Sequence, residues 1–64
     1  MTKAASDLLI GDKVEGHGTV IAITKRTAKT LTARYECFPE YVALNGVRRE
    51  STRHKLDTQL ALRG

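Results

Sequence analysis

Apolar and polar residues alternate most regularly in the last third of the chain. There, every second position holds a leucine, a histidine or a threonine: His54, Leu56, Thr58, Leu60 and Leu62. A period of two is typical of a β-strand that covers a core with one of its faces. A helix over residues 51–62 is the alternative, because Leu56 and Leu60 also stand four residues apart, Ser51 can cap it and Gly64 can end it. The alternation favours the strand.

Further strands are predicted in the first half of the chain. Residues 19–24 form a run rich in β-branched side chains and residues 31–36 alternate between apolar and polar ones, so each is predicted to be a strand. Residues 25–30 between them carry three cations and no large apolar group, which predicts the solvated tip of a hairpin. Residues 11–14 are expected to form another short strand, followed by a glycine-flanked turn at residues 15–18.

An Asn-Gly pair predicts a second hairpin. Residues 41–44 and 47–50 flank Asn45 and Gly46. A two-residue type I′ turn requires a positive φ at both central positions, which asparagine and glycine adopt readily. Pro39 is expected to close the strand region that precedes this hairpin.

The predicted fold has five short strands, and the connections between them are too short for crossover helices. Neighbouring strands are therefore expected to run antiparallel, in an all-β meander that closes into a small barrel and leaves no sheet edge unpaired. Residues 8–64 are expected to form this single domain, and residues 1–7 a flexible N-terminal arm. The predicted core consists of nine side chains: Val14, Ile21, Ile23, Leu31, Ala33, Leu44, Val47, Leu56 and Leu60.

The segment IGDKVEGHGTVIAITKRTAKTLTARYE resembles the opening of SH3-like small barrels, including the KOW and Tudor kinds. In those barrels a G-D-x-V strand, a glycine-containing loop and a G-x-V strand follow one another, and Gly11, Asp12, Val14, Gly18 and Val20 reproduce this order. The tail NGVRRESTRHKLDTQLALRG is similar to the closing strands of small bacteriophage-encoded barrels. The resemblance implies a five-stranded antiparallel SH3-like barrel, and such a fold by itself specifies no activity.

Length and composition restrict what the chain can be. Its 64 residues, of which 41% are hydrophobic, suffice for one domain with a thin core. The single cysteine cannot form an intramolecular disulfide, which predicts a reducing, cytoplasmic environment. The apolar run at residues 20–23 is too short for a membrane-spanning helix or a signal-peptide core, so no membrane contact is expected.

Positive charge is concentrated in the middle of the chain. The whole chain carries 11 Lys and Arg against 7 Asp and Glu, whereas residues 25–55 alone carry a net charge of +5. Eight cations in this stretch are candidate nucleic-acid-binding residues: Lys25, Arg26, Lys29, Arg34, Arg48, Arg49, Arg53 and Lys55. Cations near a polyanion release condensed counterions, which gives affinity without sequence-specific contacts. The alternative is a solvated surface that keeps the domain soluble and blocks edge pairing. The aromatic residues that could stack on the bases of a single strand are Tyr35, Phe38 and Tyr41.

No catalytic or metal site is predicted. The two histidines, His17 in the glycine-flanked turn and His54 on the inner face of its strand, combine with one cysteine in no zinc-binding spacing. Cys37 beside a histidine lacks a third group to orient the pair. Asp12 and Glu15 are expected in turns rather than in a desolvated pocket that would raise a carboxyl pKa. No cofactor is therefore expected, and the chain is not predicted to be an enzyme.

The sequence predicts a small basic, non-catalytic binding module. It is expected to contact nucleic acid, or a nucleic-acid-processing machine, through the cations of its central hairpins. The alternative is a protein-interaction module, such as a phage-encoded adaptor or inhibitor of a host protein, since the domain has room for one standard interface of ~800 Å² per partner. The third alternative is a homo-oligomeric enzyme whose site forms between subunits, since small barrels can pool their surfaces.

Overall fold

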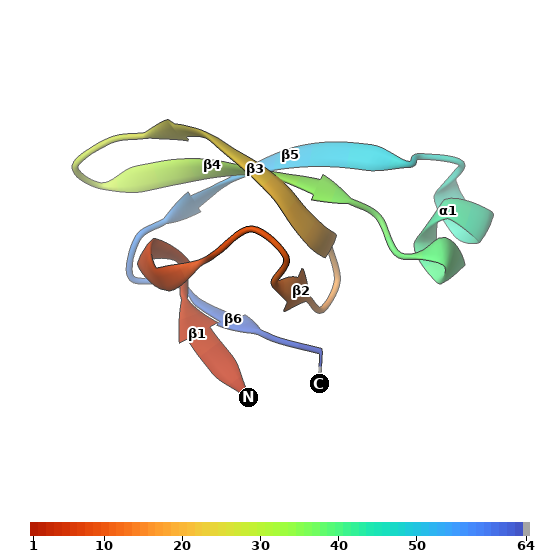
Figure 1. The fold of residues 1–64 in the computed structure, drawn as a ribbon, viewed down its shortest axis with the longest axis horizontal. Coiled ribbons are helices and arrows are strands. Elements are labelled where there is room, and N and C mark those ends of the chain that lie inside the picture. The colour runs from red at the N-terminus through yellow and green to blue at the C-terminus, as the bar shows by residue number, and fades with distance from the viewer. Residues whose placement is uncertain (64) are drawn as a thin grey trace.

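The computed structural model describes residues 1–63 (Figure 1). They contain six strands, one turn of 3-10 helix and one short α-helix, joined by loops. In chain order they are β1 (Thr2–Ala4), η1 (Ala5–Asp7), β2 (Lys13–Val14), β3 (Gly18–Arg26), β4 (Thr30–Glu36), α1 (Pro39–Asn45), β5 (Arg49–Lys55) and β6 (Gln59–Ala61). The predicted all-β class is confirmed, since strands dominate these residues. Neither η1 nor α1 is long and apolar enough to cross a membrane.

The strands form two antiparallel sheets that are joined to each other. The larger sheet has the order β2-β3-β4-β5, and the smaller one pairs β1 with β6. A bridge between Val14 and Leu62 connects the two, and the Glu15 N–H donates to the Ala61 carbonyl at 2.8 Å. Figure 1 shows the outcome as a curled arrangement in which β1, β2 and β6 lie below β3, β4 and β5.

The N-terminal segment is part of the fold, and the expected flexible arm over residues 1–7 was wrong. Thr2–Ala4 pairs with Gln59–Ala61 in antiparallel register. Ala5 is fully buried, and its N–H donates to the Thr58 carbonyl at 2.8 Å. A strand of three residues is too short to give a periodic signal in the sequence, so only its partner strand reveals it.

The predicted hairpin around Asn45 and Gly46 was wrong, because residues 39–45 form helix α1. Pro39 occupies the first turn of the helix, where a fixed φ and a missing N–H cost nothing. Gly46 ends the helix with a φ of +70°, and its N–H donates to the Val42 carbonyl at 2.8 Å. An Asn-Gly pair serves a helix end as well as a hairpin turn, since both need a residue in the left-handed region.

The C-terminal alternation does form strands, and the helix considered for residues 51–62 is absent. The chain turns at residues 56–58 and so divides the predicted strand into β5 and β6. The alternation of inward-facing and outward-facing residues nevertheless continues across the turn: His54 and Leu60 are buried, while Arg53 and Gln59 are exposed.

The core lies between the inner face of the larger sheet and the strands beneath it. The first of two irregularities in the β3–β4 register lies between Val20 and Ala22. It lets Val20 and Ile23, three residues apart, both face inward, whereas strict alternation had predicted Ile21. Leu44 and Val47, predicted as core, are 79% and 47% exposed because α1 and its following loop carry them outside. The buried apolar residues are Ala5, Leu8, Val14, Val20, Leu31, Ala33, Tyr35, Phe38 and Leu60.

Gly18 permits a close backbone approach between the start of β3 and the end of β4. Its φ is +151°, and a Cβ at this position would overlap the Glu36 carbonyl and lie 2.9 Å from the Cα of Cys37. The start of β3 therefore packs directly on the end of β4. This contact holds the preceding residue, His17, over the ring of Tyr35 (4.9 Å between ring centroids).

Candidate functional site

The outer face of β3, β4 and β5 gathers most of the cations that the sequence singled out. Six of the eight stand on these three strands, and five of those six point outward; these five are named the basic face: Lys25, Arg34, Arg49, Arg53 and Lys55.

The register of the sheet places these five side chains on one side. Residues directly opposite each other in an antiparallel pair point to the same face, and residues two apart along a strand do so too. Arg34 is opposite Ser51, and Thr32 is opposite both Arg53 and Lys25. Arg49 and Lys55 follow on the same side of β5, opposite Glu36 and Thr30. The intervening residues of β4, Leu31, Ala33 and Tyr35, are all buried, so the cations face solvent.

The basic face holds the whole excess charge of the protein. Its five cations are joined there by one carboxylate, Glu36, which leaves +4. The net charge of the chain is also +4, so its remaining six cations and six carboxylates balance. Several of those are paired, as Lys3 is with Asp12 at 2.8 Å and Arg63 with Glu15 at 2.7 Å. Within residues 1–63, no cation of the basic face lies within ion-pair distance of a carboxylate.

The other three predicted binding residues lie elsewhere. Arg26 is opposite the buried Leu31, and its guanidinium donates to the Ser6 carbonyl at 3.4 Å, on the inner side of the sheet. Arg48 stands in the loop before β5. Lys29 lies at the tip of the β3–β4 hairpin, next to the end of the basic face, where it lines a hollow together with Thr30 and Lys55.

Short hydroxyl side chains fill the spaces between these cations. Thr30, Thr32 and Ser51 alternate with them on the same face of β4 and β5. Arg34 and Arg49 line a shallow depression with Ser51 and with Glu50, whose carboxylate lies within 3.1 Å of His17. Guanidinium, ammonium and hydroxyl groups all donate hydrogen bonds, so the surface suits phosphate oxygens.

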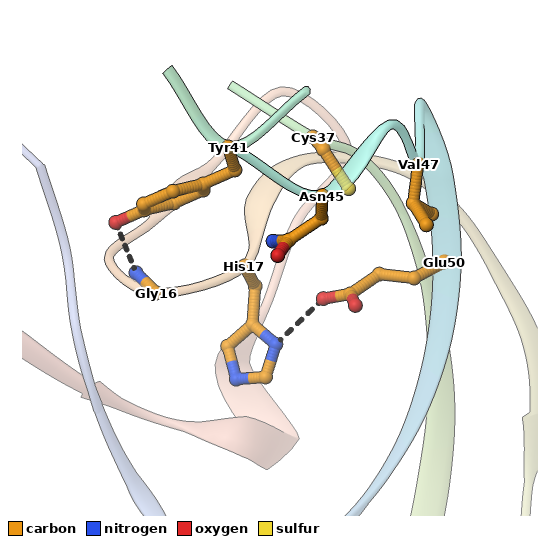
Figure 2. Close-up of a pocket in the computed structure, with 7 residues that line it drawn as sticks. All are labelled: Gly16, His17, Cys37, Tyr41, Asn45, Val47 and Glu50. Atoms are coloured by element: carbon orange, nitrogen blue, oxygen red, sulfur yellow. Dashed lines mark hydrogen bonds and ion pairs between the residues drawn. The ribbon is translucent and has the colours of Figure 1, made fainter. Parts of the chain in front are cut away.

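A second group of polar residues lies beneath α1. A pocket of about 460 Å³ lies there. Its lining residues are labelled in Figure 2: Gly16, His17, Cys37, Tyr41, Asn45, Val47 and Glu50. The Nδ1 of His17 lies 3.1 Å from a carboxylate oxygen of Glu50. Below them, the Tyr35 hydroxyl and His54 Nε2 share a buried hydrogen bond of 2.8 Å.

The arrangement in this pocket does not activate the thiol. Burial and the nearby Glu50 raise the pKa of the Cys37 thiol, which favours its protonated, unreactive form. In Figure 2, the second ring nitrogen of His17 points away from Cys37, so the imidazole is not directed at the sulfur. Among residues 1–63, no three His, Cys, Asp or Glu side chains are grouped closely enough to hold a metal ion.

The sequence identified the basic residues but gave no sign of the contacts that His17 makes with Tyr35 and Glu50. The alternating pattern placed His54 on the inner face, which its 8% exposure confirms. The partnership of His17 with Glu50 spans 33 residues and depends on the close approach at Gly18, for which the sequence holds no local signal.

Comparison with known proteins supplies no relative. No protein-family model matches the chain, and neither a curated protein nor a solved structure matches it.

Proposed function

We propose that this protein is a small basic, non-catalytic binding module that contacts the phosphate backbone of nucleic acid through the basic face. The observation that carries the proposal is the charge distribution: the face holds +4 on three adjacent strands, while the rest of the chain is balanced.

Counterion release is the physical reason for this assignment. Each Lys or Arg that comes to a phosphate frees condensed cations from the nucleic acid, and this entropy gain favours binding without any base contact. Cations that already have carboxylate partners would lose those partners on binding. Within residues 1–63 the cations of the basic face form no ion pair, so no such pair has to break when they meet a phosphate.

The fold and the environment fit this role. The curled antiparallel sheet is compatible with the SH3-like barrel that the sequence resembles, and we propose that fold family for the chain. A cytoplasmic location would keep the lone thiol of Cys37 reduced.

The test compares two charge reversals that change the net charge equally. Arg53→Glu acts at the centre of the basic face, whereas Arg48→Glu acts in the loop outside it. Binding to labelled DNA is measured by fluorescence anisotropy at about 50 mM salt. We expect Arg53→Glu to weaken binding roughly 10-fold or more and Arg48→Glu to weaken it no more than about 3-fold. Equal effects of the two variants, or no binding by the parent protein, would refute the proposal.

An acidic protein partner is the second candidate, and the open edge of β5 favours it. No strand within residues 1–63 pairs with the outer edge of β5, so its backbone groups could pair with an extended segment. A poly-glutamate peptide serves as the probe in the same assay. Binding of this peptide by a protein that does not bind DNA would favour the second candidate over the first.

A further inference from the structure

We infer that the ligand of the basic face is a double helix, bound through its sugar-phosphate backbones without base stacking. This inference rests on the proposed function and narrows its substrate class. Proteins that bind single strands usually stack the bases on aromatic side chains, beside a positively charged groove. The position of each aromatic residue in this chain therefore decides between the two kinds of nucleic acid.

Tyr35 is inaccessible to any base. It lies on the inner face of β4 and is 0% exposed. One side of its ring stacks on His17, and its hydroxyl is hydrogen-bonded to His54. The basic face lies on the opposite side of the same strand, as the exposed Arg34 next to it shows.

The other two aromatic residues belong to the α1 end of the molecule. Phe38 is 6% exposed, and the guanidinium carbon of Arg63 lies 3.8 Å from its ring centroid. Tyr41 lies in α1, and its hydroxyl donates to the Glu15 carboxylate at 3.1 Å. Figure 1 places α1 beyond the ends of β4 and β5 and below the level of the sheet. The chain has no tryptophan, so among residues 1–63 no Phe, Tyr or Trp side chain lies on the basic face.

The side chains present on the face suit phosphates rather than bases. Long cations alternate with the short hydroxyl side chains of Thr30, Thr32 and Ser51. The hydroxyls leave room for a backbone to approach and donate to phosphate oxygens, while the cations supply the charge. Among residues 1–63, the basic face offers no aromatic ring on which an unstacked base could rest.

The dimensions of the face match a short stretch of duplex. From Arg49 to Lys55, β5 extends about 20 Å, and β3 lies about 10 Å from β5 across the sheet. A double helix rises 3.4 Å per base pair on each strand, so the face spans roughly six base pairs. The duplex carries one charge per about 1.7 Å of axis. It therefore presents a dense row of phosphates to all five cations.

The experiment compares a DNA duplex of about 12 base pairs with each of its separate strands, by anisotropy between about 50 and 200 mM salt. We expect the duplex to bind at least about 10-fold more tightly than either strand at the lower salt concentration. Five phosphate contacts predict a slope of log K against log salt near −4.5, which is a loss of about 500-fold across this range. Arg53→Glu should make the slope shallower by about 1.

The outcomes separate this inference from the proposed function. Strands that bind as tightly as the duplex, or a Tyr41→Leu variant that loses roughly 10-fold in affinity, would overturn the inference and leave the proposed function standing. Absence of binding to all three DNA molecules would overturn both. The same titration is made with an RNA duplex of equal length. Tight binding of either the DNA or the RNA duplex supports the inference.

Discussion

Burial, and to a smaller extent the neighbouring His17, hold the pKa of His54 below its ordinary value of 6.5. His54 is neutral in the fold and shares a hydrogen bond with the Tyr35 hydroxyl. Burial, with a contribution from Glu50, raises the pKa of Tyr35 to about 12. The two side chains thus form an uncharged polar contact in the core, which is stable only while neither group ionises.

Acidification should destabilise the protein through His54. The unfolded histidine takes up a proton near pH 6.5 and the folded one only at lower pH, so the stability is complete above pH 6.5 and falls as the pH drops below it. We expect the melting temperature to decrease between about pH 7.5 and pH 5. A His54→Gln variant should show a smaller decrease. Equal decreases in the parent and the variant would contradict this account.

At the scale of the element, β5 is an edge strand whose cations protect it from pairing with a second copy of the chain. The Cys37 N–H donates to the Arg48 carbonyl, and the Leu56 N–H to the Lys29 carbonyl. Because paired and unpaired residues alternate in an antiparallel ladder, the backbone groups of Arg49 and Arg53 point away from β4. Two such edges would bring like charges together, so the cations disfavour pairing between copies of the chain.

Removal of these edge cations should therefore cause self-association. The double variant Arg49→Thr/Arg53→Thr keeps the strand propensity but removes the repulsion. In sedimentation velocity at equal protein concentration, we expect the variant to have a larger sedimentation coefficient than the parent protein, because it forms dimers or larger species. The control is Lys25→Thr/Arg34→Thr, which removes the same charge from the strands β3 and β4, whose edges are already paired. Identical behaviour of the two variants would show that net charge alone matters.

At the scale of the whole molecule, the chain ends hold the two sheets together. β1 pairs with β6, and the residues after β6 bridge to β2. Lys3 on β1 also contacts Asp12, and this ion pair, with the Leu9 N–H, lowers the pKa of the Asp12 carboxyl. A core this thin depends on such pairing, because it has few apolar side chains to spare.

Deletion of residues 1–4 tests this dependence. The loss of the β1–β6 ladder should reduce the free energy of unfolding by roughly 2–3 kcal/mol, which is a large part of what a domain of this size has. Urea unfolding measures the change. Lys3→Ala removes only the partly exposed ion pair and should cost less than about 1 kcal/mol. A deletion variant as stable as the parent would restore the idea of a flexible arm.

The sequence by itself determined which side chains face inward wherever the strands alternate without interruption. It placed Leu31, Ala33, His54 and Leu60 in the core, because a period of two survives any pairing of regular strands. It identified the charged residues as well, but it could not tell that five of eight share a face.

Tertiary structure decided the rest. The second irregularity in β3 turns Lys25 outward, two residues after the inward-facing Ile23, and only the pairing with β4 fixes such a bulge. Asn45 and Gly46 satisfy a hairpin and a helix end equally well, and contacts of α1 with residues as distant as Gly16 favour the helix. The physical reason is the same in each case. Local residue patterns set the periodicity of a segment, whereas its partner sets the register, and the register decides which charges meet on one surface.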